Sequence, residues 1–168
     1  FDIPVDHLDS HAVFIPYIEN LKLENLTFAA PDVGSANRIR EIASYFEAEI
    51  VICDKHRKRA NEIASMVVIG DVTDRDVVII DDICDTGGTL AKSAALLMEK
   101  GARSVRALIT HPVLSGKAYE NIEKSVLDEL MESNHATGSL AGGIDSARHV
   151  ITAAFGQASA DEILERIR

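Results

Sequence analysis

The stretch Val77-Val78-Ile79-Ile80-Asp81-Asp82-Ile83-Cys84-Asp85-Thr86-Gly87-Gly88-Thr89 decides how this 168-residue sequence is interpreted. Its apolar start predicts a strand in the centre of a sheet, covered on both faces. Apolar residues at helical spacing from Leu90 to Met98 predict a helix from about Gly88 to Lys100, which Gly101 is placed to end. We therefore expect the segment from Asp81 to Thr89 to be a loop that joins a buried strand to a helix.

Short apolar runs alternate with helix-like stretches along most of the chain, which is typical of a parallel sheet with helices on its faces. Residues 35–46 have the apolar spacing of an amphipathic helix, and residues 115–122 suggest a short helix. We predict an α/β domain whose parallel sheet has roughly five strands, with a site at the strand ends after Ala30 and Ile80. The further strand-like runs are Leu26–Ala30, Glu49–Cys53, Met66–Ile69, Val105–Ile109 and Ser125–Leu130.

The character of the sequence changes after Met131. Residues 135–143 are small, polar and without periodicity, which is the composition of a linker. Two helix patterns follow, one over residues 145–155 and one that opens at Ser159. We therefore divide the chain into a domain over residues 1–131 and an atypical linker and helical tail over residues 132–168.

The formal net charge of −10 argues against general affinity for nucleic acids or anionic membranes, because either partner requires a basic surface. No segment approaches the roughly 18 consecutive apolar residues that span a bilayer. Cys53 and Cys84 are too few for a disulfide framework and are interpreted as buried thiols in a reducing cytosol. A cytoplasmic protein is predicted. The sequence begins with Phe1 and not with Met, so a removed segment and an excised fragment both stay open.

The turn after the apolar strand has the residue types of a phosphate-binding loop. Gly87 and Gly88 permit positive φ and close approach of an anion, and the hydroxyls of Thr86 and Thr89 add donors. Backbone N–H groups at the start of the following helix can point at the same anion. The alternative is that Asp85 only caps the helix and that the glycines only make a turn.

The two acids before the turn suit a sugar, because carboxylates accept hydrogen bonds from a diol. The full string resembles the phosphoribosyl-pyrophosphate binding motif of type I phosphoribosyltransferases and ribose-phosphate pyrophosphokinases. In that family the acids lie along the ribose 2- and 3-hydroxyls, and the turn holds the 5-phosphate. The resemblance assigns ribose 5-phosphate to Asp81, Asp82, Asp85, Thr86, Gly87, Gly88 and Thr89.

Four further segments resemble the C-terminal half of ribose-phosphate pyrophosphokinases, namely Phe1–Leu8, Ala30–Arg38, Asp54–Arg57 and Thr110–Gly116. The resemblance runs from Phe1 to about Leu130, whereas a simple phosphoribosyltransferase would share only residues 77–89. The pyrophosphokinases are therefore the better match.

The resemblance makes Asp32 to Arg38 the loop that receives pyrophosphate, through Asp32, Gly34, Ser35 and Arg38, with Asp32 near a Mg²⁺ ion. The loop follows a strand and lies at the positive end of a helix, as anion binding requires. A simple helix-capping turn is the alternative. Many relatives have a second glycine where Ser35 stands.

Lys55 and Arg57 match the mobile catalytic loop of the same family, in which a Lys and an Arg close over the transferring pyrophosphoryl group. Phosphoryl transfer depends on positioning and charge neutralisation, and cations on a movable arm serve both. A solvated charged loop or hairpin arm is the alternative for residues 54–59. The six histidines show no metal spacing, and we interpret them, His111 included, as surface or structural residues.

The resemblance implies that the β,γ-pyrophosphoryl group of Mg-ATP is transferred to ribose 5-phosphate, giving phosphoribosyl pyrophosphate (PRPP) and AMP. It also implies Mg²⁺ as cofactor and a homo-oligomer. The N-terminal half that supplies the ATP-binding loop in the family has no counterpart in these residues, so we expect an incomplete enzyme. A phosphoribosyltransferase and a non-catalytic binding or regulatory homologue remain the alternatives.

Overall fold

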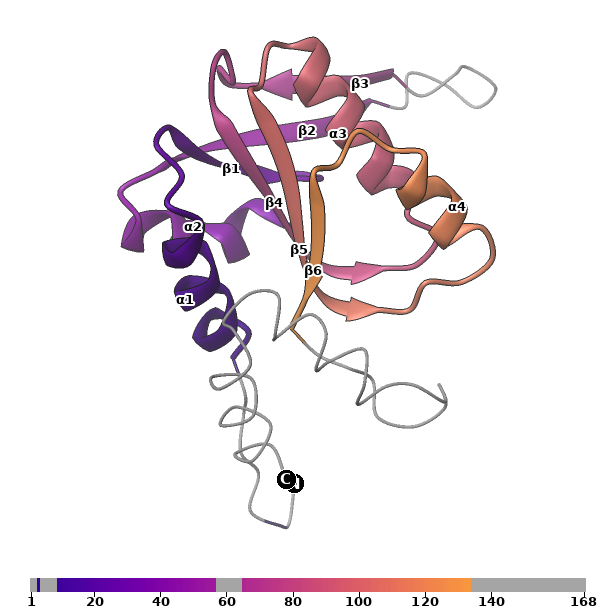
Figure 1. Cartoon of the computed structure of the whole chain (residues 1–168), viewed down its shortest axis with the longest axis horizontal. Coiled ribbons are helices and arrows are strands. Elements are labelled where there is room, and N and C mark those ends of the chain that lie inside the picture. Colours follow the sequence, from indigo (N-terminus) through magenta and orange to yellow (C-terminus); the bar gives the residue numbers. More distant parts are fainter. Residues whose placement is uncertain (1–2, 4–8, 57–64, 134–168) are drawn as a thin grey trace.

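A computed structural model describes residue 3, residues 9–56 and residues 65–133, without the side chains of residues 55, 56 and 65. One twisted sheet runs through this part of the chain, with helices on both of its faces (Figure 1). The strands are β1 (Leu26–Ala30), β2 (Glu49–His56), β3 (Ser65–Ile69), β4 (Asp76–Cys84), β5 (Ser104–Pro112) and β6 (Glu129–Glu132). The helices are α1 (His11–Leu21), α2 (Ala36–Tyr45), α3 (Gly88–Glu99) and α4 (Ala118–Glu123).

The strand order is β3-β2-β1-β4-β5-β6, and every neighbouring pair is parallel except β2 and β3. The predicted α/β class with a parallel sheet is confirmed, with six strands in the described residues where roughly five were expected. The antiparallel pair is a hairpin arm. Its first strand continues through Lys55, which lies opposite Met66, so residues 54–56 are strand and not loop.

Two hydrophobic cores cover the two faces of the sheet. One packs α3 against the strands, and the other packs α1 and α2 against the opposite face. Val77 and Ile79 of β4 belong to the α3 core, whereas Val78 and Ile80 belong to the α1–α2 core. This strand is therefore buried on both faces, as its uniform apolar sequence predicts. Cys53 and Cys84 are free and buried.

Several element boundaries differ from the sequence prediction, among them the ends of β2 and β5, which extend to His56 and Pro112. β4 continues to Cys84, so Asp81 and Asp82 are strand residues and only residues 85–87 form the turn. β6 begins at Glu129 and not at Ser125, because the Asp128 carboxylate accepts a 2.8 Å hydrogen bond from the Val105 N–H and holds the chain in a turn. α4 begins at Ala118, three residues later than predicted.

Helix α1 lies in a segment, residues 9–25, for which no element was predicted from the sequence. Pro16 lies inside this helix, and its buried face consists of Phe14, Tyr17 and Ile18. The predicted boundary at residue 131 stays a prediction, since residues 134–168 lie outside the described part of the chain. No helix in the described residues combines the length and the apolar character that crossing a lipid bilayer requires.

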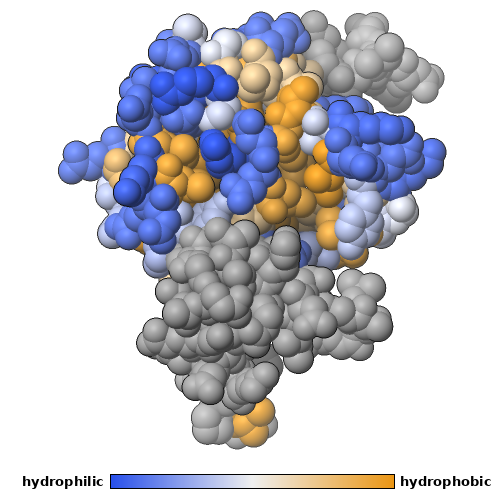
Figure 2. Space-filling model, viewed as in Figure 1, coloured by the Kyte–Doolittle hydropathy of each residue, from blue (hydrophilic) through white to orange (hydrophobic). Residues whose placement is uncertain are grey.

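Side chains on the face shown in Figure 2 are segregated by hydropathy. Hydrophilic side chains cover both flanks of this face, and apolar side chains are visible between them over the middle of the sheet.

Candidate functional site at the carboxyl edge of the sheet

The turn between β4 and α3 presents a set of backbone donors. Gly87 has a φ of +70°, in the left-handed region, and stands immediately before the first residue of α3. No side chain caps this helix, and its first turn carries no acidic residue. The first N–H groups of a helix have no partner within it, and its N-terminus favours anions. This arrangement suits an anion such as a phosphate group, and the predicted role of Gly87 and its neighbours in binding one stays a prediction.

The connection between β5 and α4 holds this turn in place. The Ser115 N–H donates a 2.9 Å hydrogen bond to the Asp85 carbonyl, and the Ser115 hydroxyl donates to the Asp85 carboxylate. The Asn121 side-chain amide donates to the Thr86 carbonyl over 2.9 Å. Because these contacts come from a separate segment, the turn is preorganised. The Asp85 side chain therefore already helps to fix the turn, in addition to its predicted place in the ribose 5-phosphate site.

Asp81 and Asp82 are successive residues of β4, and their carboxylates interact with each other. The Asp82 N–H donates a 2.9 Å hydrogen bond to Asp81 Oδ1. Burial, together with the carboxylates of Asp82 and Asp32, raises the pKa of Asp81 to about 6, against the lowering effect of the Asp82 N–H. Burial also works to raise the pKa of Asp82, but the hydrogen bond and charge of Arg38 outweigh it and hold this pKa below its ordinary value.

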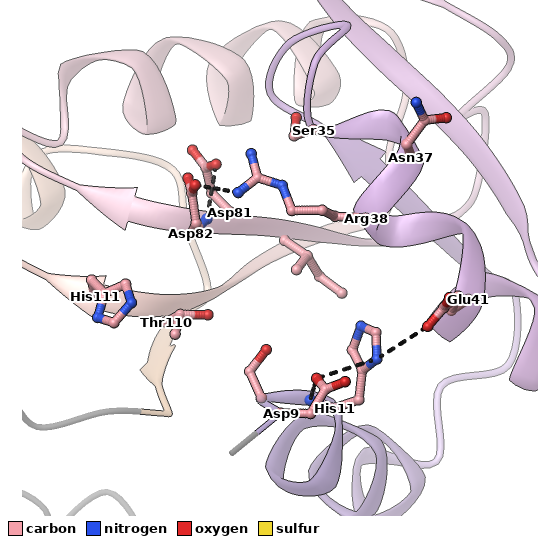
Figure 3. A pocket seen from close by; sticks show the side chains of 12 residues that line it. Asp9, His11, Ser35, Asn37, Arg38, Glu41, Asp81, Asp82, Thr110 and His111 are labelled. Atoms are coloured by element: carbon pink, nitrogen blue, oxygen red, sulfur yellow. Dashed lines mark hydrogen bonds and ion pairs between the residues drawn. The ribbon is translucent and has the colours of Figure 1, made fainter. Parts of the chain in front are cut away.

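Arg38 connects the two predicted loops. It lies in the first turn of α2, and its guanidinium pairs with the Asp82 carboxylate of β4, as Figure 3 shows. The pairing with Asp82 raises the pKa of Arg38 further. From the sequence, Arg38 was predicted to bind pyrophosphate and Asp82 to bind the sugar. The contact between these two side chains was not predicted.

The loop from Asp32 to Ser35 closes on itself before α2. The Ser35 N–H donates to Asp32 Oδ1 over 2.8 Å, and the Ser35 hydroxyl donates to the Asp32 carbonyl over 2.9 Å. Ser35 is buried, and a Cβ at Gly34 would lie 3.2 Å from Asp32 Oδ1. The loop therefore has the features of a helix-capping turn, and one oxygen of Asp32 is already engaged within it.

Two pockets meet at Asp81. The smaller pocket, of about 320 Å³, is lined by the turn of residues 85–87 together with Asp32 and Asp81. The larger pocket, of about 540 Å³, is lined by Arg38 and Asp82 among others. Among the predicted site residues, Asp32, Asp81, Asp85, Thr86, Gly87 and Thr89 line the smaller pocket, and Ser35, Arg38, Asp81 and Asp82 line the larger one. Gly34 and Gly88 line neither pocket.

The two predicted catalytic cations are only partly placed. The backbone of Lys55 lies near the end of β2, which is parallel to β1, so it approaches the same edge of the sheet as the loop after β1. Arg57 lies outside the described residues. Their catalytic role stays a prediction.

The larger pocket contains residues that the sequence analysis missed or set aside. His11 Nδ1 lies 3.4 Å from Asp9 Oδ1 and 3.9 Å from Glu41 Oε2, and all three side chains line the pocket (Figure 3). Asp9 was not predicted to be a site residue, and His11, the first residue of α1, was interpreted as a surface or structural residue. His111, interpreted as structural, also lines this pocket beside Thr110. Its place just after a predicted strand end was the one signal in the sequence.

The residues near Asp32 fit a Mg²⁺ ion that the substrate helps to coordinate. Asp32 and Asp82 lie close enough to Asp81 to raise its pKa. Among the described residues, the Arg38 guanidinium is the cation whose charge interacts with these three carboxylates. A divalent cation would relieve this excess of negative charge. The described residues contain no group of three or more ligating side chains. Mg²⁺ commonly takes one or two carboxylates and completes its coordination with water and phosphate oxygens.

The family profile described as the phosphoribosyl transferase domain matches residues 11–140, which is most of the chain. This chain belongs to the phosphoribosyltransferase family. A ribose-phosphate pyrophosphokinase from Campylobacter jejuni is 51% identical over 131 residues, and the alignment covers 78% of this chain and 42% of that protein. The chain thus spans less than half the length of this relative.

Solved structures agree with the family assignment. The crystal structure of phosphoribosylpyrophosphate synthetase from Mycobacterium smegmatis matches with a TM-score of 0.71 and 27% identity, over 91% of this chain and 53% of that one. An adenine phosphoribosyl transferase from Trypanosoma brucei, with a TM-score of 0.59 and 19% identity over 73% of this chain and 62% of that one, shares the fold. The predicted phosphoribosyltransferase fold and the resemblance to ribose-phosphate pyrophosphokinases are both confirmed.

Replacement of Gly87 is expected to destabilise the protein more than replacement of Gly88, the other glycine of this turn. A Cβ at Gly87 would force a side chain into the left-handed region and would lie 3.0 Å from Ile122 Cγ1. Gly87→Ala should lower the free energy of unfolding by roughly 1–2 kcal/mol, measured by urea denaturation. Gly88→Ala is the matched control, because its Cβ would meet only Thr86 Oγ1 at 3.7 Å. Equal losses in both variants would contradict this account.

The raised pKa of Asp81 predicts a specific pH dependence of stability. The folded state binds this proton more tightly than the unfolded chain, so its contribution is complete below about pH 4 and declines as the pH rises to about 6. Asp81→Asn should remove the decline and raise the free energy of unfolding at pH 8 by roughly 1–2 kcal/mol, a figure already discounted for partial exposure. Thermal unfolding at pH 4 and pH 8 measures this difference.

Asp71→Asn serves as the control with the opposite sign. Hydrogen bonds from Thr73 lower the pKa of Asp71, so this substitution should reduce stability at pH 8. If Asp81→Asn also lowered the free energy of unfolding at pH 8, the ionised carboxylate of Asp81 would not be destabilising, and this explanation would be wrong.

Proposed function

We propose that this chain supplies the ribose 5-phosphate and pyrophosphate loops of a ribose-phosphate diphosphokinase. The reaction transfers a pyrophosphoryl group from Mg-ATP to ribose 5-phosphate, giving PRPP and AMP. The observation that carries the proposal is the N-terminus of α3, which follows Gly87 and has no side-chain cap. It lies beside the acids at the end of β4, Asp81 and Asp82. The similarity to ribose-phosphate pyrophosphokinases supports this reaction over the other chemistry of the fold.

Ribose 5-phosphate would bind with its phosphate on the turn. The backbone N–H groups at the start of α3 and the hydroxyls of Thr86 and Thr89 would donate to the phosphate oxygens. The diol of the ribose would lie along β4, where the carboxylates of Asp81 and Asp82 would accept its hydrogen bonds. Because the turn is anchored through Ser115 and Asn121, the sugar would be held by a rigid set of donors.

The pyrophosphoryl group would lie against the loop of Asp32, Gly34 and Ser35, at the start of α2, with Arg38 nearby. Oxygen O1 of ribose 5-phosphate attacks the β-phosphorus of ATP, the bond to the α–β bridging oxygen breaks, and AMP departs while O1 loses its proton. Lys55 and Arg57 would stabilise the charge that develops during this transfer. Mg²⁺, held through Asp32, would neutralise charge on the phosphate oxygens.

The rest of the enzyme lies beyond what this chain contains. Since the chain spans 42% of its Campylobacter jejuni relative, we propose that ATP recognition requires a further half of the enzyme. Assembly as a homo-oligomer in the cytoplasm is part of the same proposal. The charge of −10 argues against nucleic-acid and membrane partners, as in the sequence analysis.

The chain should bind ribose 5-phosphate, and Thr89→Ala should weaken this binding about tenfold. That ratio corresponds to roughly 1.4 kcal/mol, the size of one hydrogen bond to a charged group. Isothermal titration calorimetry with Mg²⁺ present gives both dissociation constants. Thr73→Ala is the control, because it makes the same chemical change before β4, at the opposite edge of the sheet. Absence of binding heat and of thermal stabilisation at millimolar ligand would remove the proposed function.

Lys55→Ala should act on the transition state, in the enzyme completed with its missing half. We expect kcat to fall by two or more orders of magnitude, roughly 3 kcal/mol, with little change in the KM for ribose 5-phosphate. Steady-state kinetics separates the two parameters, and Lys100→Ala at the far end of α3 is the control for loss of charge. A raised KM with an unchanged kcat would withdraw the catalytic assignment of Lys55 and Arg57.

A further inference from the structure

The ion pair of Arg38 and Asp82 joins the two proposed ligand loops directly. Arg38 belongs to the helix that follows the pyrophosphate loop, and Asp82 is one of the two acids that face the sugar. Their side chains point toward one another across the larger pocket (Figure 3). Each of these two side chains is therefore engaged by the other.

The pair is exposed enough to exchange partners. The Arg38 side chain is 54% exposed and the Asp82 side chain is 44% exposed. Exposed ion pairs contribute little to stability, because water screens the charges and the side chains lose freedom. A phosphate group offers the planar guanidinium two oxygens for bidentate hydrogen bonding and carries more charge than a carboxylate. A phosphorylated ligand can thus compete with Asp82 for Arg38.

The pair takes up part of the acceptor capacity that the two acids could offer to a diol. Arg38 occupies Asp82 Oδ2, and Asp81 Oδ1 accepts the N–H of Asp82. Two sugar hydroxyls that donate to this edge would compete with Arg38 for the Asp82 carboxylate. Release of Arg38 would return an acceptor oxygen to the sugar site.

We propose that Arg38 is a positioning residue that exchanges between Asp82 and a ligand phosphate, so that pyrophosphate binding frees Asp82 for the ribose diol. This inference rests on the proposed function. It adds that pyrophosphate strengthens the binding of ribose 5-phosphate, and that this effect depends on the exchange of one ion pair, Arg38–Asp82. By linkage, ribose 5-phosphate then strengthens pyrophosphate binding by the same factor.

The experiment measures ribose 5-phosphate binding to the full chain by calorimetry, with and without saturating inorganic pyrophosphate and Mg²⁺. The variants are Arg38→Gln, which removes the charge, Asp82→Asn, which removes the partner, and Arg38→Lys, which retains the charge. Arg40→Gln is the matched control, since it changes the same residue type on the same helix outside both pockets. Melting temperatures without ligand show that each variant is folded.

In the wild-type chain, pyrophosphate should tighten ribose 5-phosphate binding by about fivefold or more, the lower end of typical coupling between sites. Arg38→Gln should bind ribose 5-phosphate alone at least as tightly as the wild type, although a cation beside an anionic ligand has been removed. Its response to pyrophosphate should disappear. Asp82→Asn should bind the sugar more weakly and also lose the response, Arg38→Lys should keep part of it, and Arg40→Gln should match the wild type.

Two outcomes overturn the exchange. If Arg38→Gln weakens ribose 5-phosphate binding and keeps the wild-type response to pyrophosphate, Arg38 is a simple ligand contact. If the two ligands bind independently in the wild type, the ion pair couples nothing. In both cases the sugar still binds, and the proposed function stands. Failure of the wild type to bind ribose 5-phosphate at all would instead remove the proposed function itself.

Discussion

The parallel pairing of β1 with β4 is the constraint on which the candidate site depends. Thr27 lies opposite Val77 and Ala29 opposite Ile79, so both strands end at the same edge of the sheet. From there the chain leaves in opposite directions, to β2 through α2 and to β5 through α3, and the two helices cover opposite faces. A crevice opens where strand order reverses in this way, and the two predicted ligand loops lie on its two sides.

Side-chain alternation along β4 then determines how the two acids divide. Val77 and Ile79 face the α3 core, and Val78 and Ile80 face the α1–α2 core, so Asp81 continues the first series and Asp82 the second. Asp82 therefore pairs with Arg38 of α2, whose charge also acts on Asp81, and burial above all raises the pKa of Asp81. The raised pKa shows that the site costs the folded state stability, as functional sites commonly do.

The sequence predicted those parts of the site that follow from local pattern. The uniform apolar run before Asp81 identified the central strand, and the glycines identified the turn, because both signals lie within a few residues of one another. The Arg38–Asp82 pair could not be predicted in this way, since it joins residues 44 positions apart. Helix α1 was not predicted, and Pro16 inside it interrupts the helical pattern. Of the pocket residues beside it, Asp9 was not singled out and His11 was interpreted as a surface or structural residue.

The two ends of β4 carry acid–base pairs of opposite character. At its start Asp76 is 6% exposed, and it accepts a 3.1 Å hydrogen bond from Arg103 Nε and a 2.6 Å hydrogen bond from the Ser104 hydroxyl. Those bonds hold the pKa of Asp76 below its usual range and fix the strand to its neighbour.

Near its other end, Asp82 has a long, half-exposed partner on a different element. A buried, multiply bonded pair resists exchange because breaking it would strand a charge, whereas water can replace either partner of an exposed pair. The same strand thus separates the two demands on it: the amino end secures the sheet, and the carboxyl end keeps its charges available to a ligand.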